Sequence, residues 1–169
     1  MREGGFVTSG QGDLVKVQFR REIDEDGWPG VASEGLWGRL LPDGLVRLEN
    51  NPWFVRGIAN GDTVRTEIGE DGLRHFAELV EWSGYCVVRV IPWRKGPLAG
   101  DRQAVLDLFA AFGITGEGTE RPVNIVSLEI PPDADFAAIK RLLVEGERDG
   151  RWAYEEGCIG DDWAAAGPG

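Results

Sequence analysis

Residues that commonly bind transition metals are scarce in this sequence. It contains one histidine, His75, and two cysteines, Cys86 and Cys158. The cysteines are far apart and lack the Cys-x-x-Cys spacing of zinc knuckles and thioredoxin-like redox sites, so we interpret both as small buried hydrophobic residues. A lone histidine cannot build the usual multi-histidine zinc or iron site. We therefore expect no metal and no cofactor.

Several motifs and segments that would assign a function are also missing. The sequence has no Gly-x-Gly-x-x-Gly after a predicted strand, no Walker lysine motif and no Gly-x-Ser-x-Gly. The common nucleotide-dependent and serine-hydrolase chemistries therefore have no support. No apolar run approaches the roughly 20 residues that cross a bilayer, and no signal region opens the chain. We expect no membrane span and a cytoplasmic location.

The sequence contains fewer basic residues than acidic ones. Eighteen basic residues stand against 29 acidic ones, which gives a formal net charge of −11. The summed field repels phosphate backbones, so nucleic acid is not expected as a partner. The same charge favours solubility, and it would also steer a basic protein or a cationic ligand to the surface. Both interpretations stay open, and the sequence does not indicate an oligomeric state.

The residues that are present indicate a globular α+β protein. Apolar residues make up 42% of the chain and charged residues 28%, which is ordinary for a folded protein. In the first half, alternating apolar and polar residues and the turn signal Pro42-Asp43-Gly44 indicate about five strands. These strands are predicted near 15–20, 36–41, 45–48, 63–68 and 73–82. We predict a small antiparallel β-barrel, because a closed barrel leaves no strand with an unpaired edge.

The second half mixes strand and helix patterns. Strands are predicted at 85–93, 124–130 and 152–158, with a weak one near 114–120. Asp101 can cap a helix whose apolar residues recur at helical spacing, and Asp133 or Asp135 can cap a second helix. The resulting order β-α-β-β-α-β is the split arrangement called ferredoxin-like.

These patterns predict two domains with a boundary near Ser83-Gly84. The barrel unit spans 14–83 and the ferredoxin-like unit spans 84–163. Residues 1–13 and 164–169 are rich in small residues and poor in large apolar ones. We expect a flexible arm and a flexible tail there.

Five short motifs are spread over most of residues 15–159. They are Glu34 to Trp37, Asn51 to Phe54, Gly61 to Val64, Ser83-Gly84 and Trp152 to Glu155. Together they resemble the Glu-x-Leu-Trp, Asn-x-Pro-Phe-like, Gly-Asp-x-Val, Ser-Gly and Trp-x-Tyr-Glu elements of an uncharacterised bacterial family, described only as a domain of unknown function. Trp53 departs from the phenylalanine of that pattern, which could alter a pocket. The resemblance implies a shared fold and no established activity.

Adjacent aromatic residues in the Asn-Asn-Pro-Trp-Phe loop need a physical explanation, because they are costly to leave in water. In one interpretation, Trp53 and Phe54 close the end of the barrel while the asparagines bond to their own backbone. In the other, Trp37, Trp53 and Phe54 form a concave wall, and Asn51 helps to orient a ligand. These four residues are candidate ligand-binding residues.

Three charged residues complete the candidate site. Arg89 lies among apolar strand residues and needs a carboxylate partner, for which the closing strand offers Glu155 and Glu156; we add Arg89 to the candidate ligand-binding residues. Glu34 and Asp62 are the candidate catalytic residues, because carboxylates in apolar surroundings can adopt different protonation states. The simpler interpretation makes them an exposed loop carboxylate and a turn residue. The sequence does not show whether they share a pocket.

We therefore expect a non-catalytic binding or regulatory protein that engages a protein partner or a small apolar molecule. An inhibitor of a basic toxin, of the immunity-protein kind, is one version, suggested by charge and size. The alternative is a small cofactor-independent enzyme, an isomerase, cyclase or hydrolase, that positions its substrate between aromatic residues and paired carboxylates. Whether the protein is an enzyme stays open at this point.

The net charge generates a first test. We expect no binding to random-sequence duplex DNA or RNA at physiological salt, because the charge of −11 opposes the phosphate field that dominates non-specific affinity. Fluorescence anisotropy of a labelled duplex measures this, with a basic DNA-binding domain as the positive control. Micromolar binding that weakens as the salt concentration rises would contradict the expectation.

Overall fold

The structure is a computed structural model that describes residues 12–20, 25–27 and 33–167. The chain divides into two compact units. The first unit comprises Met1–Asn50 and Gly61–Ser83, and the second comprises Asn51–Asn60 and Gly84–Gly169. The segment Asn51–Asn60 is thus a loop that leaves the strands of one unit and belongs to the other. Within the described residues, none of the helices has the length and apolar character needed to cross a membrane.

The first unit is a closed β-barrel. Its strands are β1 (Leu14–Arg20), β2 (Ser33–Leu40), β3 (Val46–Leu48), β4 (Thr63–Ile68) and β5 (Arg74–Glu81). Consecutive strands pair antiparallel, and β1 also pairs with β5 in parallel, which closes the barrel. Alternate apolar side chains are buried, namely Val17, Phe19, Leu36, Val46, Leu48 and Val64. The predicted barrel is confirmed, with one parallel pairing that the alternation of residues does not reveal.

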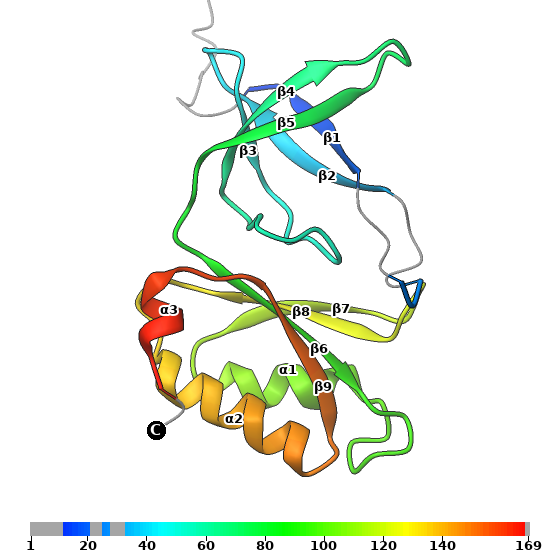
Figure 1. Cartoon of the computed structure of the whole chain (residues 1–169), viewed down its shortest axis with the longest axis vertical. Coiled ribbons are helices and arrows are strands. Elements are labelled where there is room, and N and C mark those ends of the chain that lie inside the picture. Colours follow the sequence, from blue (N-terminus) through cyan, green and yellow to red (C-terminus); the bar gives the residue numbers. More distant parts are fainter. Residues whose placement is uncertain (1–11, 21–24, 28–32, 168–169) are drawn as a thin grey trace, which may run out of the picture. The chain divides into compact units, whose positions relative to one another are not determined.

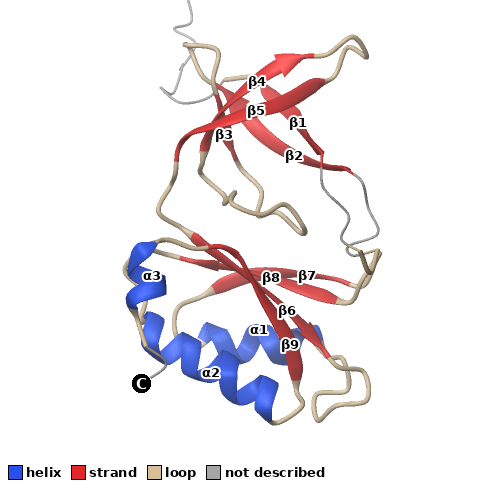
Figure 2. Cartoon of the chain, viewed as in Figure 1, coloured by secondary structure: helices blue, strands red, loops and turns tan. Residues whose placement is uncertain are grey.

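The second unit is a four-stranded antiparallel sheet with two helices on one face (Figures 1 and 2). Its elements are β6 (Cys86–Pro92), α1 (Arg102–Ala110), β7 (Thr115–Thr119), β8 (Ile125–Ile130), α2 (Phe136–Arg148) and β9 (Trp152–Cys158). The strand order across the sheet is β7-β8-β6-β9. Each helix connects strands that are not hydrogen-bonded neighbours, which is the predicted ferredoxin-like arrangement.

The core of the second unit lies between the sheet and the helices. Its fully buried members include Val88, Val90, Leu128, Phe109, Ile139, Leu143 and Trp152. The indole Nε1 of Trp152 donates to the Leu143 carbonyl at 3.0 Å, so the one polar atom of this large side chain is satisfied. The helices therefore cover one face of the sheet, and the other face does not contact them.

Aspartates begin both helices. The Asp101 carboxylate accepts from the backbone N–H groups of Gln103 and Ala104, and Asp135 accepts from that of Ala138. These bonds satisfy amide groups that have no partner within the helix. Asp101 is the predicted cap, and of the two candidates for the second helix the structure selects Asp135.

A short helix, α3 (Asp161–Ala165), follows β9. Trp163 is fully buried, and its ring meets that of Phe136 edge-on at 5.4 Å between centroids. The Lys140 ammonium donates to the carbonyls of Trp163 and Ala166. The segment 164–169, expected to be a tail, therefore begins as helix, because one buried tryptophan is enough to anchor it. Most of the arm predicted at 1–13 lies outside the described residues.

Gly146 generates a test of the core. It is buried in α2, and a Cβ added there would lie 2.1 Å from Cε2 and Cζ2 of Trp152. Helix propensity alone favours alanine by about 1 kcal/mol, but such an overlap forces the ring to move. We expect Gly146→Ala to lower the free energy of unfolding by about 1–3 kcal/mol, measured by denaturant unfolding at unchanged slope.

The double variant Gly146→Ala/Trp152→Phe is the control for this test. The smaller ring leaves room for the new methyl group, so the same glycine substitution should cost less in the Trp152→Phe background. A gain in stability from Gly146→Ala alone would contradict the packing described here.

Candidate functional site

A row of polar residues crosses the sheet of the second unit on the face opposite its helices. Glu117 on β7 pairs with Ser127 on β8, Ser127 pairs with Arg89 on β6, and Arg89 pairs with Glu155 on β9. Successive residues in a strand point to opposite faces, and the neighbours Val88 and Val90 belong to the core beneath the helices. The row Glu117, Ser127, Arg89 and Glu155 therefore faces away from that core.

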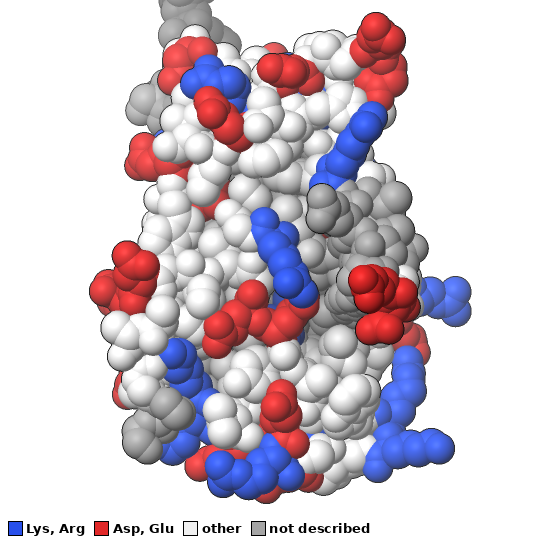
Figure 3. Space-filling model, in the orientation of Figure 1, with Lys and Arg blue, Asp and Glu red and all other residues white. Residues whose placement is uncertain are grey.

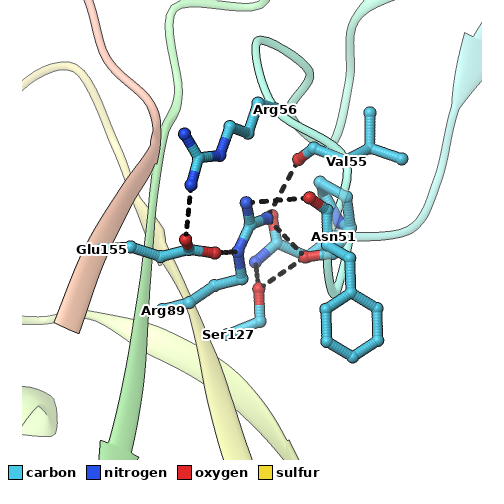
Figure 4. A network of polar contacts seen from close by, with 8 residues as sticks. Asn51, Val55, Arg56, Arg89, Ser127 and Glu155 are labelled. Carbon is cyan, nitrogen blue, oxygen red and sulfur yellow. Dashed lines mark hydrogen bonds and ion pairs between the residues drawn. The ribbon is translucent and has the colours of Figure 1, made fainter. Parts of the chain in front are cut away.

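The loop Asn51–Asn60 bonds to this row through its backbone (Figure 4). The guanidinium of Arg89 donates from Nη1 to the Val55 carbonyl at 3.0 Å and to the Pro52 carbonyl at 3.4 Å. From Nη2 it donates to the Phe54 carbonyl at 3.2 Å. A planar group with five N–H donors can reach several carbonyls at once, which a lysine ammonium cannot do with the same geometry.

Glu155 provides the negative charge for Arg89. Arg89 Nε lies 2.7 Å from Glu155 Oε1, and Arg56 Nη2, from the loop, lies 3.1 Å from Glu155 Oε2. The Arg89 side chain is fully buried, so its desolvation has to be offset by a charge and by hydrogen bonds. The sequence-based prediction that Arg89 has a carboxylate partner on the closing strand is met by Glu155.

Ser127 and Asn51 extend the network toward β7. Ser127 Oγ donates to the Pro52 carbonyl at 2.9 Å, and Asn51 Nδ2 donates to Ser127 Oγ at 2.6 Å. The serine has a single hydroxyl hydrogen, and the Pro52 carbonyl can only accept, so the group that Asn51 presents to Ser127 must be its NH₂. The Asn51 Oδ1 atom is consequently turned elsewhere, and it is buried without a hydrogen-bond partner.

Further contacts hold the end of the loop. Asn60 Nδ2 donates to Glu129 Oε1 at 2.7 Å, and the Gly57 N–H donates to the Gly157 carbonyl at 2.8 Å. A Cβ on Gly157 would lie 2.7 Å from the guanidinium carbon of Arg89, so only glycine leaves space for the arginine there. The loop is an integral layer of the second unit, held by contacts of both its main chain and its side chains.

The structure brings together three of the five candidate ligand-binding residues. Asn51, Phe54 and Arg89 belong to this network, and Trp53, in the same loop, is half-buried. Trp37 lies on β2 of the other unit with 43% of its surface exposed, and the Lys16 ammonium sits 5.5 Å from its ring centroid. Residues 51–60 belong to the second unit, and the role of Trp53 and Phe54 as a plug of the barrel stays a prediction.

The candidate catalytic pair lies in the barrel unit. Asp62 is fully buried, and its Oδ1 accepts from the backbone N–H of Ser83 at 2.8 Å. Glu34 is buried on β2 opposite Phe19. The Leu48 N–H donates a hydrogen bond to the Asp62 carbonyl. Leu48 on β3 is paired with Gly38 on β2, and Gly38 lies four residues beyond Glu34. At about 3.3 Å per residue the two positions are on the order of 13 Å apart along the strand, and a catalytic role for Glu34 and Asp62 stays a prediction.

A hollow that the sequence analysis missed lies at the end of β6. Its volume is about 690 Å³. The residues around it come from the end of β6, the following turn, the β7–β8 connection and the turn after α2: they include Ile91, Pro92, Trp93, Val123 and Asn124, with Arg94, Lys95 and Glu120 at charged positions. The run Trp93-Arg94-Lys95, an aromatic residue followed by two basic ones, is a weak signal for it, because the sequence repeats the pattern at Phe19-Arg20-Arg21.

The Cys86 thiol is not activated. Both cysteines are buried, as the sequence predicts. Burial raises the pKa of the Cys86 thiol, and the charge of Glu156 adds to this, while a hydrogen bond with the Gly160 backbone opposes it. A raised pKa keeps the thiol protonated and unreactive at neutral pH. Among the residues that the structure describes, no group of three or more His, Cys, Asp or Glu is placed to hold a metal ion.

Arg89 generates the test of the network. We expect Arg89→Lys to lower the free energy of unfolding by about 3 kcal/mol or more, because one ammonium cannot replace the bonds to three carbonyls and Glu155, and breaking buried ionic networks is costly. Denaturant unfolding measures the loss. Hydrogen exchange of the Gly57 amide, which bonds to Gly157, should accelerate because the loop is released.

Arg56→Lys is the matched control. Arg56 binds the other oxygen of Glu155, but its side chain is 72% exposed, so its loss should cost less than about 1 kcal/mol. Equal small losses from the two substitutions would show that the buried guanidinium does not hold the loop.

Comparison with known proteins agrees with this fold and assigns no activity. A solved structure of a hypothetical protein from Neisseria gonorrhoeae is similar, with a TM-score of 0.72 and 23% identity over 89% of this chain and 98% of that one. At this identity the likeness shows the fold alone. No curated protein matches the chain. The family model described as a domain of unknown function, DUF4265, matches residues 34–154, in agreement with the resemblance seen in the motifs. The chain therefore belongs to the DUF4265 family.

Proposed function

We propose that the protein is a non-catalytic binding protein, and that its second unit takes a small molecule with an apolar body and an anionic group in the hollow at the end of β6. The observation that carries this proposal is the hollow itself, about 690 Å³ in volume and bordered by Trp93. Small-molecule sites commonly have volumes of about 300–1,000 Å³ and combine apolar walls with a few polar groups.

Trp93 is the anchor in this proposal. It is 47% exposed, although its backbone is fixed: its N–H donates to the Arg151 carbonyl at 3.0 Å, and its carbonyl accepts from Gly96 and Gly100. An exposed tryptophan on a fixed backbone offers a large apolar surface at a low entropic cost. A ligand covering this ring would remove apolar surface from water.

The charges of the hollow favour an anion. Arg94 and Lys95 outnumber Glu120 among the residues around it, in contrast to the acidic balance of the chain. The one ion pair, between Arg94 and Glu120, is long at 3.5 Å and exposed on both sides, so it contributes little and can open. A carboxylate, sulfonate or phosphate on the ligand can then bind the arginine.

Two other functions have less support. The catalytic candidates Glu34 and Asp62 are not among the residues of the hollow, where Glu120 is the single carboxylate, so paired acid and base work has no basis there. For a basic protein partner, the net charge remains the argument. On the face drawn in Figure 3, however, acidic and basic side chains of the described residues are interspersed, without a broad acidic field.

Binding of 1-anilinonaphthalene-8-sulfonate tests the proposal, because this dye has apolar rings and one anionic group. We expect it to bind the folded protein and Trp93→Ala to raise its dissociation constant about tenfold, since aromatic anchors dominate such energies. Lys95→Gln should weaken binding to a smaller extent. Dye fluorescence measures the affinity, and near-ultraviolet circular dichroism verifies that each variant stays folded.

Trp37→Ala is the control, because Trp37 is about as exposed as Trp93 but belongs to the other unit. If it weakens dye binding as much as Trp93→Ala, the dye reports exposed tryptophans in general and the hollow is not the site. A dye that binds wild type and Trp93→Ala equally well leads to the same conclusion.

A further inference from the structure

A second, smaller hollow of about 150 Å³ lies beside β7 in the same unit. It is lined by Asn51 of the loop, by Thr115, Gly116 and Glu117 of β7, and by Glu129 of β8. Because β7 is the edge strand of the sheet, the hollow lies where the polar row of the sheet ends. Thr115 pairs with Glu129 and Glu117 with Ser127, so these side chains point to the face that carries the loop.

Asn51 gives this hollow an unsatisfied acceptor. The residue is 8% exposed, its NH₂ group is fixed on Ser127, and its Oδ1 is buried without a hydrogen-bond partner. An unpaired buried carbonyl destabilises the folded protein. A group that donates a hydrogen bond to Oδ1 would therefore be favoured at this position.

The charged groups of the hollow are both negative. Among the described residues, neither Glu117 nor Glu129 forms an ion pair. Glu129 accepts one hydrogen bond, from Asn60, and Glu117 is exposed. The Asn51 NH₂ group is directed to Ser127, so apart from the Thr115 hydroxyl the side chains here present acceptors to the hollow.

The opposite end of the same row indicates what fits such a set of acceptors. On β9, Glu155 binds the guanidinium groups of Arg89 and Arg56. On β7, Glu117 occupies the equivalent end of the row and has no cationic partner among the described residues. We infer that the hollow beside β7 binds an organic cation with several N–H donors, a guanidinium or a primary ammonium, which bonds to Asn51 Oδ1 and to the carboxylates of Glu117 and Glu129.

An organic cation suits this site better than a metal ion. Among the described residues, no group of three or more His, Cys, Asp or Glu is placed to hold a metal ion, and the hollow has two carboxylates beside one amide and one hydroxyl. N–H donors match a carbonyl and two carboxylates directionally. A volume of about 150 Å³ admits the head group of a ligand, so the rest of it would extend past the edge of β7. The net charge of −11 would draw cations toward the protein.

Two sources can supply this head group: a free amine or guanidine, and an arginine or lysine side chain of a basic polypeptide. Their shared chemistry defines the site. The inference stands apart from the hollow at the end of β6, because the two hollows share no residue. Either one can fail experimentally without affecting the other.

Titration of the full ¹⁵N-labelled chain tests the inference, with agmatine as the free probe and the peptide acetyl-Gly-Gly-Arg-Gly-Gly-amide as the polypeptide probe. We expect saturable shifts of the Asn51 side-chain amide and of the Thr115 and Glu117 backbone amides. Glu117→Gln should raise the dissociation constant about tenfold, because a hydrogen bond to a charged group is lost. Tighter binding of agmatine indicates a free amine, and tighter binding of the peptide indicates a protein side chain.

Glu147→Gln is the matched control. Glu147 is an exposed glutamate on α2 without an ion pair among the described residues, so this variant removes the same charge from the same unit and should bind as wild type does. The inference is overturned if both variants weaken binding equally, since that indicates general charge attraction. It is also overturned if the shifts spread over all acidic surfaces, if neither probe binds, or if calcium chloride shifts the same resonances at lower concentration than agmatine.

Discussion

The second unit depends on the burial of one positive charge. Arg89 is fully buried on the face of the sheet that the helices leave uncovered, and a buried cation is tolerated only when its charge and its N–H donors are satisfied. Glu155 supplies the charge, and the loop Asn51–Asn60 supplies three carbonyls. The requirement of Arg89 explains why a loop that begins and ends in barrel strands is part of the other unit.

The same requirement restricts which residues can surround the loop. The loop contributes carbonyl oxygens, which any residue can provide, but the neighbouring side chains have to leave space for the guanidinium and orient the loop. Gly157 leaves space for the guanidinium, and Ser127 orients Asn51 through a chain of two hydrogen bonds. The network is complete at β9, where Glu155 binds two arginines, and incomplete at β7, where acceptors outnumber donors. The two ends of the polar row differ because Arg89 and Arg56 both lie beside Glu155, whereas Glu117 has no arginine beside it among the described residues.

The two hollows of the second unit have opposite electrostatic character. The larger one combines Trp93 with Arg94 and Lys95, and the smaller one combines Asn51 with two glutamates. Among the described residues, Glu120 is the one carboxylate of the larger hollow and is in an ion pair with Arg94, whereas neither glutamate of the smaller hollow is in an ion pair. The charges of the larger hollow therefore favour an anionic group, and those of the smaller hollow favour a cationic one.

Most strands and helices of this protein can be predicted from the order of its residues, because the signals for them are local. Alternation predicted β1 and β4, Asp101 predicted the start of α1, and the strand and helix patterns together predicted the β-α-β-β-α-β order. The sequence also indicated that Arg89 needs a glutamate on the closing strand, since a charge among apolar residues must be paired. Contacts between distant residues decide that the loop Asn51–Asn60 covers the sheet, that Trp163 anchors α3, and that three separate segments meet around Trp93. Backbone carbonyl groups are the same in every residue, so their role in binding Arg89 cannot be predicted from the sequence. Hollows form between segments that are distant in the sequence, so no local pattern of side chains indicates them.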